Sequence, residues 1–214
     1  MGSATRKIAN AFSTSGIIQS ANINNASLDN ITTIAGAGDM VLISSQTASA
    51  SASISFTSGI DSTYKEYQFY FVNINPSTDE VYFTFQTSTN GGSSYDVSLT
   101  STYFHTYHGE GGAGGVLEYD STMDQANGTG EQRLLYALGN GSDESASGNL
   151  ILFNPSSTTF VKHYVSNCNW YHYQDYNFNA RTAGYFNTTS AINAIRFSIS
   201  SGNFDGKILM FGVN

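Results

Sequence analysis

The chain contains 214 residues and is rich in small polar side chains, with 30 Ser, 21 Thr and 20 Asn, whereas charged residues make up only 11%, against roughly 25% in an ordinary soluble domain. The formal net charge is −8, and the basic residues form no cluster beyond Arg6-Lys7, which excludes the positive surface of a nucleic-acid-binding protein. The single cysteine, Cys168, excludes an intrachain disulfide framework and a cysteine-based zinc site. No apolar run reaches the roughly 18 residues of a membrane span, so membrane insertion is not expected.

Residues 1–46 differ from the rest of the chain in having a single aromatic residue, Phe12, among short phrases of Ile, Ala, Asn and Ser. No helical stripe runs through them, which favours an extended arm that becomes ordered against another surface. A disordered tail is the alternative. The candidate assembly residues of this arm are Arg6, Ile8, Phe12, Ile17, Ile18, Ile23, Leu28 and Ile31.

After the arm, β-branched and aromatic residues alternate with polar ones, which is typical of half-buried β-strands. Asn90-Gly91 permits the positive φ of a tight turn between two of them. Short strands at this spacing, with only two prolines, predict an all-β domain over residues 47–214, folded as an antiparallel β-sandwich or jelly roll. The predicted strands are Ala48–Phe56, Tyr67–Ile74, Glu80–Gln86, Tyr95–Tyr103, Asn149–Phe153, Thr159–Val165, Asn169–Tyr173, Thr182–Phe186, Ala194–Ile199 and Lys207–Val213.

The segment at about 108–147 interrupts this pattern with two glycine-rich runs, GEGGAGG from Gly109 and GNGSDES from Gly139. We predict long loops here, at one end of the sandwich. The piece between them, Glu131–Leu138, is the one stretch in which we expect two turns of helix, covering a sheet edge.

Two histidines and a carboxylate, His105, His108 and Glu110, lie within six residues and resemble a metal-binding cluster. On a strand, however, His105 and His108 are separated by an odd number of residues and point to opposite faces. No metal is therefore predicted at this cluster. The other histidines, His163 and His172, lie in alternating aromatic segments and are expected at the surface or half-buried.

Carboxylates that lie close together in the loop region invite two further hypotheses, a glycosidase and a calcium site. Glycine-rich, water-exposed segments do not raise a carboxyl pKa as a general acid requires, so no enzymatic activity and no cofactor are predicted. Calcium binding stays an open alternative, although the sequence contains no DxDxDG loop that would support it. The residues concerned are Glu110, Glu118, Asp120 and Asp124 for hydrolysis, and Asp120, Asp124, Asp143 and Glu144 for calcium.

The aromatic run between Tyr164 and Tyr176 is the best candidate for a binding surface. Exposed Tyr and Trp rings stack on sugars while neighbouring amides and carboxylates bond the hydroxyls, so Trp170, Tyr171 and Tyr173 are candidate glycan contacts. The alternative follows from strand alternation. If Trp170 faces the core, His172 and Gln174 face inward with it, and Tyr171 and Tyr173 face outward.

Three phrases of the sequence are distinctive: SFTSGIDSTYKEYQFYFVNINPSTDEVYFTFQTSTNGGSSYD at Ser55–Asp96, LFNPSSTTFVKHYV at Leu152–Val165, and AGYFNTTSAINAIRFSISSGNFDGKILMFGV at Ala183–Val213. They resemble a recurrent module of virion proteins in tailed bacteriophages, particularly marine ones. The opening TRKIANAFSTSGIIQSANINNASLDNIT, Thr5–Thr32, is similar to fibre-like phage proteins.

This resemblance implies a non-enzymatic structural role on the exterior of a virion, in a protein made in the host bacterial cytoplasm. A capsid decoration protein and a tail-fibre protein both fit it, with other capsid or tail proteins as partners and a homo-oligomer, possibly a trimer, as the assembly. A module that recognises host surface glycans is the alternative function. An enzyme that cuts surface polysaccharide would rest on the loop carboxylates alone.

Overall fold

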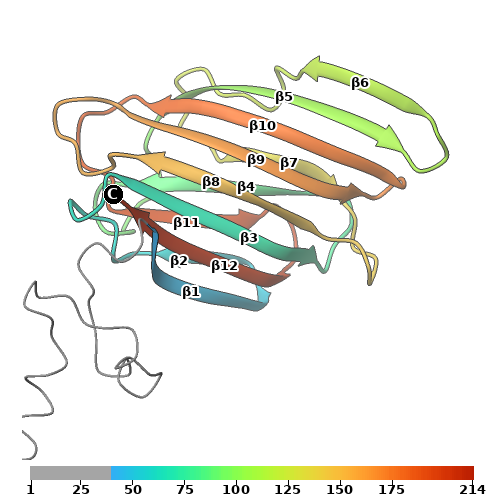
Figure 1. The fold of residues 1–214 in the computed structure, drawn as a ribbon, viewed down its shortest axis with the longest axis horizontal. Coiled ribbons are helices and arrows are strands. Elements are labelled where there is room, and N and C mark those ends of the chain that lie inside the picture. The colour runs from blue at the N-terminus through green and yellow to red at the C-terminus, as the bar shows by residue number, and fades with distance from the viewer. Residues whose placement is uncertain (1–39) are drawn as a thin grey trace, which may run out of the picture. The chain divides into compact units, whose positions relative to one another are not determined.

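The computed structural model of the protein describes residues 40–214, in which every regular element is a β-strand and every strand pairing is antiparallel. The all-β prediction is thereby confirmed (Figure 1). The strands are β1 (Met40–Ser51), β2 (Ser53–Phe56), β3 (Glu66–Pro76), β4 (Val81–Ser88), β5 (Leu99–Gly109), β6 (Gly114–Tyr119), β7 (Gln132–Leu138), β8 (Ala146–Phe153), β9 (Lys162–His172), β10 (Tyr176–Phe186), β11 (Ala194–Ile199) and β12 (Phe204–Val213).

The strands form two layers of unequal size, as Figure 1 shows. The larger layer follows the order β1-β12-β3-β8-β9-β10-β5-β6, and the smaller follows β7-β4-β11-β2. The two layers are continuous where Leu138 of β7 pairs with His172 of β9. The result is a sandwich that closes like a barrel along one side.

Alternation along the strands places the aromatic residues between the two layers. In β9 buried and exposed residues alternate strictly from Lys162 to Trp170. Across the layers, the Phe71 ring of β3 lies 5.2 Å from Phe83 of β4, and Phe85 of β4 lies 5.0 Å from Tyr164 of β9. Each fully buried aromatic side chain contributes about 1.5–3 kcal/mol to folding.

The expectation of a helix at Glu131–Leu138 is wrong, because these residues form the strand β7. β7 pairs with β4 and buries Leu134, Leu135 and Leu138 in the core. Adjacent Leu134 and Leu135 are both buried where the register with β4 shifts, so the period of two is broken locally. Pairing with a distant strand overrides the local preference for helix.

Several boundaries also differ from the predicted ones. β1 begins at Met40, which pairs with Val213, so the sandwich starts seven residues before the predicted position. The single strand predicted at Ala48–Phe56 is divided between β1 and β2, with Ala50 at φ 45° and a register shift beside it. The candidate arm residues from Arg6 to Ile31 lie outside the described residues.

Two further differences concern the length of strands. The segments predicted as Thr159–Val165 and Asn169–Tyr173 belong to one long strand, β9. The glycine-rich run from Gly109 is the turn between β5 and β6, not a long loop, with positive φ at Gly112 and Gly114. Within residues 40–214 no helix is long and apolar enough to cross a membrane.

Candidate functional site

Asparagines occupy the outward positions in the middle of the larger layer. Asn149 of β8 pairs in register with Asn167 of β9, and Asn169 of β9 pairs with Asn179 of β10. Diagonal side-chain hydrogen bonds connect them: the Asn169 amide donates to Asn177 Oδ1 at 2.7 Å, and the Asn179 amide donates to Asn167 Oδ1 at 3.0 Å. This asparagine face therefore presents an ordered array of amide groups to solvent.

At one end of the asparagine face lies a cavity of about 320 Å³. Tyr171 of β9 sits in it opposite Asn177 of β10, its register partner. Carboxylates reach the cavity from two turns, Glu110 after β5 and Asp143 before β8. We call it the Tyr171 pocket; its lining residues are Glu110, Asp143, Ser145, Asn169, Trp170, Tyr171 and Asn177.

The three predicted glycan contacts have different positions in the structure. Trp170 is 2% exposed, and its ring stacks at 5.2 Å on Phe178 in the interior. The Trp170 ring is therefore not available to a sugar, which corrects that part of the prediction. Tyr171 and Tyr173 are half-buried, Tyr173 in the turn after β9. Strand alternation predicts that His172 and Gln174 face inward with Trp170. This is confirmed for His172, which is buried, and wrong for Gln174, which is exposed because β9 ends at His172.

Tyr171 is held among acidic groups. Its hydroxyl donates to Asp175 Oδ1 at 3.1 Å. Desolvation raises the pKa of Tyr171 to about 12, and hydrogen bonds to the carboxylates of Asp175 and Glu110 act in the same direction. The phenol is thus neutral at pH 7, and it offers the pocket a ring rather than a charge.

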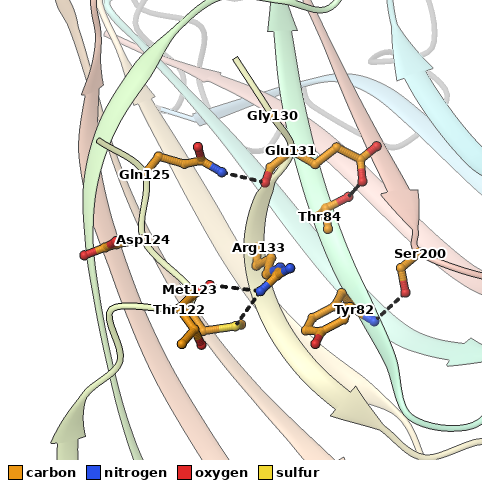
Figure 2. A pocket seen from close by; sticks show the side chains of 10 residues that line it. All are labelled: Tyr82, Thr84, Thr122, Met123, Asp124, Gln125, Gly130, Glu131, Arg133 and Ser200. Atoms are coloured by element: carbon orange, nitrogen blue, oxygen red, sulfur yellow. Dashed lines mark hydrogen bonds between the residues drawn. The ribbon is translucent and has the colours of Figure 1, made fainter. Parts of the chain in front are cut away.

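A second cavity, of about 360 Å³, lies on the smaller layer (Figure 2). Arg133 of β7 is its central side chain: the guanidinium lies 4.3 Å from the centre of the Tyr82 ring, and Nη1 donates to the Thr122 carbonyl at 2.9 Å. Cation–π contact and hydrogen bond together fix the orientation of Arg133. The lining residues are Tyr82, Thr84, Thr122, Met123, Asp124, Gln125, Gly130, Glu131, Arg133 and Ser200.

Two further polar residues of this Arg133 pocket are bonded to Glu131. The Glu131 carboxylate accepts from the Thr84 hydroxyl at 3.1 Å, and the Gln125 amide donates to the Glu131 carbonyl at 3.2 Å (Figure 2). Because Arg133 forms no ion pair within the described part of the chain, its other donors are free for a ligand. Sequence reasoning missed this pocket because Tyr82 and Arg133 meet only through the pairing of β4 with β7.

The predicted positions of the histidines on β5 are confirmed. His105 is 1% exposed, whereas His108 is exposed on the other face. His105 Nε2 instead lies 3.0 Å from Oε1 of Glu118, on the neighbouring strand β6.

The acidic residues considered for calcium lie in two separate places in the structure. Asp120 and Asp124 follow β6, where Asp124 accepts a hydrogen bond from the Tyr119 hydroxyl. Asp143 and Glu144 lie in the turn before β8, where Glu144 accepts from the Gly141 amide at 2.6 Å. Among residues 40–214 no group of three or more His, Cys, Asp or Glu side chains is placed to hold a metal ion.

No protein-family model matches the sequence, and no curated protein matches it.

Proposed function

We propose that the protein is a non-enzymatic structural component on the exterior of a tailed-phage particle, of capsid-decoration or tail-fibre type, anchored by its N-terminal residues. The phage-like phrases of the sequence support this role. So does the polar outer surface of the sandwich, because few charges and many amides and hydroxyls make contacts that depend weakly on salt.

The observation that carries the proposal is the edge of strand β1 that faces away from β12. Within residues 40–214, β1 pairs with β12 on one side only, which leaves its other edge open. Met40, Val41 and Leu42 are 41%, 42% and 52% exposed at its start, where the anchoring segment joins the sandwich. An open edge with exposed apolar side chains favours pairing with another chain.

Incorporation into particles tests this role. Host cells would express tagged full-length protein or tagged residues 40–214 during infection, and purified particles would be assayed for the tag. Full-length protein is expected in the particles and the truncated form in the soluble fraction, with the melting temperature of the sandwich unchanged. Equal incorporation of both forms, or absence of the full-length protein from particles, would contradict the proposal.

The open edge has its own test with a matched control. Leu42→Ser on β1 removes an apolar contact from the edge, whereas Phe160→Ser changes an exposed aromatic residue elsewhere, 69% exposed. Leu42→Ser is expected to reduce incorporation and Phe160→Ser to leave it unchanged. Sedimentation of the full-length protein and of residues 40–214 then tests the trimer, which a monomer in both cases would rule out.

A second candidate function, recognition of host surface glycans, rests on the Tyr171 pocket. There a half-buried phenol ring lies beside two carboxylates and two amides, the groups that stack on a pyranose and bond its hydroxyls. On a glycan array, Tyr171→Ala and Asn177→Ala are expected to lose the signal, and Tyr185→Ala, exposed on the same layer, to keep it. An array without hits, or with hits that survive Tyr171→Ala, would remove this candidate.

A further inference from the structure

The outer face of the larger layer carries an apolar band beside the asparagine face. Register connects the outward residues of β1, β12, β3, β8, β9 and β10, which Figure 1 shows side by side, into rows across the layer. One row contains Leu42, Phe211, Gln68, Ile151, Val165 and Ala183. The next row contains Met40, Val213, Glu66 and Phe153, and His163 and Tyr185 continue it on β9 and β10. We call these two rows the apolar band.

Two strands under the band are apolar on both faces. In β8 every residue of 150–153 is apolar, and in β12 every residue of 208–211. A strand that is covered on one face alternates apolar with polar residues, whereas continuous apolar runs are typical of strands covered on both faces. Leu42, Phe153 and Val165 are nevertheless 52%, 36% and 40% exposed within the described part of the chain. The band therefore has the composition of a surface that another surface covers.

The polar side chains in and beside the band bond one another. The Tyr70 hydroxyl, next to the band on β3, donates to Gln68 Oε1 at 2.8 Å, and the Gln68 amide donates to the Glu66 carboxylate. The edge of the Tyr70 ring also packs on Phe211, with 5.7 Å between the ring centres and 89° between the planes. Because Gln68 already has partners on its own strand, covering the band leaves its amide hydrogen-bonded.

The charge distribution favours a second copy of the chain as the partner of this surface. The net charge of −8 makes two copies repel each other through most of their surfaces. Carboxylates lie in the turns, such as Asp79, Glu110 and Asp143, whereas Glu66 is the one carboxylate of the band. A basic partner would be attracted to the turns. The band is instead the place where two acidic copies can approach closely.

The order of the strands makes the band complementary to itself. β3 and β9 flank β8, and β12 and β10 lie one strand further out on either side. If two bands face each other across a two-fold axis parallel to β8, β3 of one copy lies over β9 of the other. Glu66 then faces His163 of the second copy, an acceptor opposite a donor. Phe211 faces Ala183, a large side chain opposite a small one.

We propose that the apolar band binds the same band of a second copy of the chain, in a pair whose two-fold axis runs along β8. The band extends about 24 Å from β1 to β10 at roughly 4.8 Å per strand, which is close to the width of a standard interface of about 800 Å² per partner. The asparagine face borders it as a polar rim. Tyr171, six residues along β9 from Val165, lies about 20 Å away and stays accessible.

The pairing is independent of the role in the virion, because it concerns association of the purified protein in solution. It gives a dimer, which differs from the trimer that the resemblance leaves possible. The result of the particle-incorporation experiment therefore does not decide it.

Sedimentation equilibrium of the full-length protein tests the pairing. The wild type is expected to form dimers with a dissociation constant on the order of 10 µM or below. Phe153→Glu, on the axis, sets two carboxylates against each other and is expected to weaken dimerisation at least about tenfold. Leu117→Glu, on β6 at the far edge of the same outer face and 69% exposed, is the matched control and should leave dimerisation unchanged. Melting temperatures confirm that each variant is folded.

A charge exchange then tests the position of the axis. His163→Glu sets a carboxylate against Glu66 of the second copy and is expected to weaken dimerisation about three- to tenfold. Adding Glu66→Lys to this variant should restore the wild-type affinity to within about threefold. The restoration distinguishes a contact between copies from a local effect of either substitution.

Four outcomes would overturn the proposal. They are a wild type that forms trimers, equal dimerisation of folded Phe153→Glu and the wild type, a charge exchange that restores nothing, and a monomeric wild type. A monomer that floats with phosphatidylcholine vesicles would show that a lipid surface covers the band instead.

Discussion

The ring of Phe197 on β11 packs 5.0 Å from that of Phe71 on β3, across the space between the two layers. Phe197 is fully buried, and it also contacts Phe69, Phe83 and Phe85. One residue thus connects β11 to strands of both layers, and its removal leaves a cavity that the surrounding rings cannot close.

We therefore expect Phe197→Ala to lower the free energy of unfolding by about 3–5 kcal/mol, and Phe197→Leu to lower it by less, since leucine fills part of the volume. Urea denaturation followed by circular dichroism measures both. Phe160→Ala, at a site that is 69% exposed, is the control and should change stability by no more than about 0.5 kcal/mol. Similar losses at positions 160 and 197 would contradict this account of the core.

Gly148 on β8 leaves no room for a side chain. A Cβ atom there would lie 2.5 Å from the Asn167 carbonyl oxygen and 2.8 Å from Cys168 Cα, both backbone atoms of the neighbouring strand. Gly148→Ala is expected to force β8 and β9 apart and to lower the free energy of unfolding by about 1–3 kcal/mol.

Gly111, in the turn between β5 and β6, provides the matched control. A Cβ atom there meets nothing within 4 Å, and the φ of Gly111 lies outside the left-handed region. Gly111→Ala should leave stability unchanged or raise it slightly, by restricting the unfolded chain. Thermal melts measure the change in stability of both variants. Equal changes would show that the close approach of β8 and β9 does not constrain position 148.

Buried phenols make stability sensitive to alkali. Burial raises the pKa of Tyr103 well above its ordinary value near 10, and raises that of Tyr136 to about 12. Above pH 10 the unfolded chain releases protons that the folded chain retains, so the free energy of unfolding falls as the pH rises through and beyond this window. Below pH 10 these groups contribute no pH dependence.

Tyr103→Phe tests this account. The Tyr103 hydroxyl is buried without a hydrogen-bond partner, so its removal should raise the free energy of unfolding at pH 7 by about 1 kcal/mol and reduce the alkaline loss. Urea denaturation between pH 8 and 11, with tyrosinate absorbance recorded in parallel, measures both effects. A steeper alkaline loss in the variant, or a large loss at pH 7, would contradict it.

Cys168 offers a direct probe of whether β9 separates from its neighbouring strands. The thiol is 2% exposed, and burial raises its pKa to about 12, so neither access nor thiolate character favours reaction. We expect no modification by a thiol reagent in the native protein and complete modification of one thiol per chain in denaturant. Rapid reaction of the native protein would show that β9 opens readily from its neighbours.

Much of the fold could be predicted from the local sequence pattern, because successive residues of a β-strand point to opposite faces of the sheet. The odd spacing of His105 and His108 predicts opposite faces, and the structure has one buried and one exposed. The same rule places His172 inward beside Trp170. It fails at Gln174 because the end of β9 is decided by the turn to β10, which alternation does not encode.

The sequence by itself determined the class of the fold, the identity of most strands and the faces of their residues, because alternation is a property of neighbours along the chain. Only the tertiary structure decided that Glu131–Leu138 is a strand, since its hydrogen bonds are made to β4. The pockets, too, exist only in the tertiary structure. Tyr82 meets Arg133, and Tyr136 meets Phe178, through pairing and packing between segments some forty or more residues apart, and no local pattern carries that information.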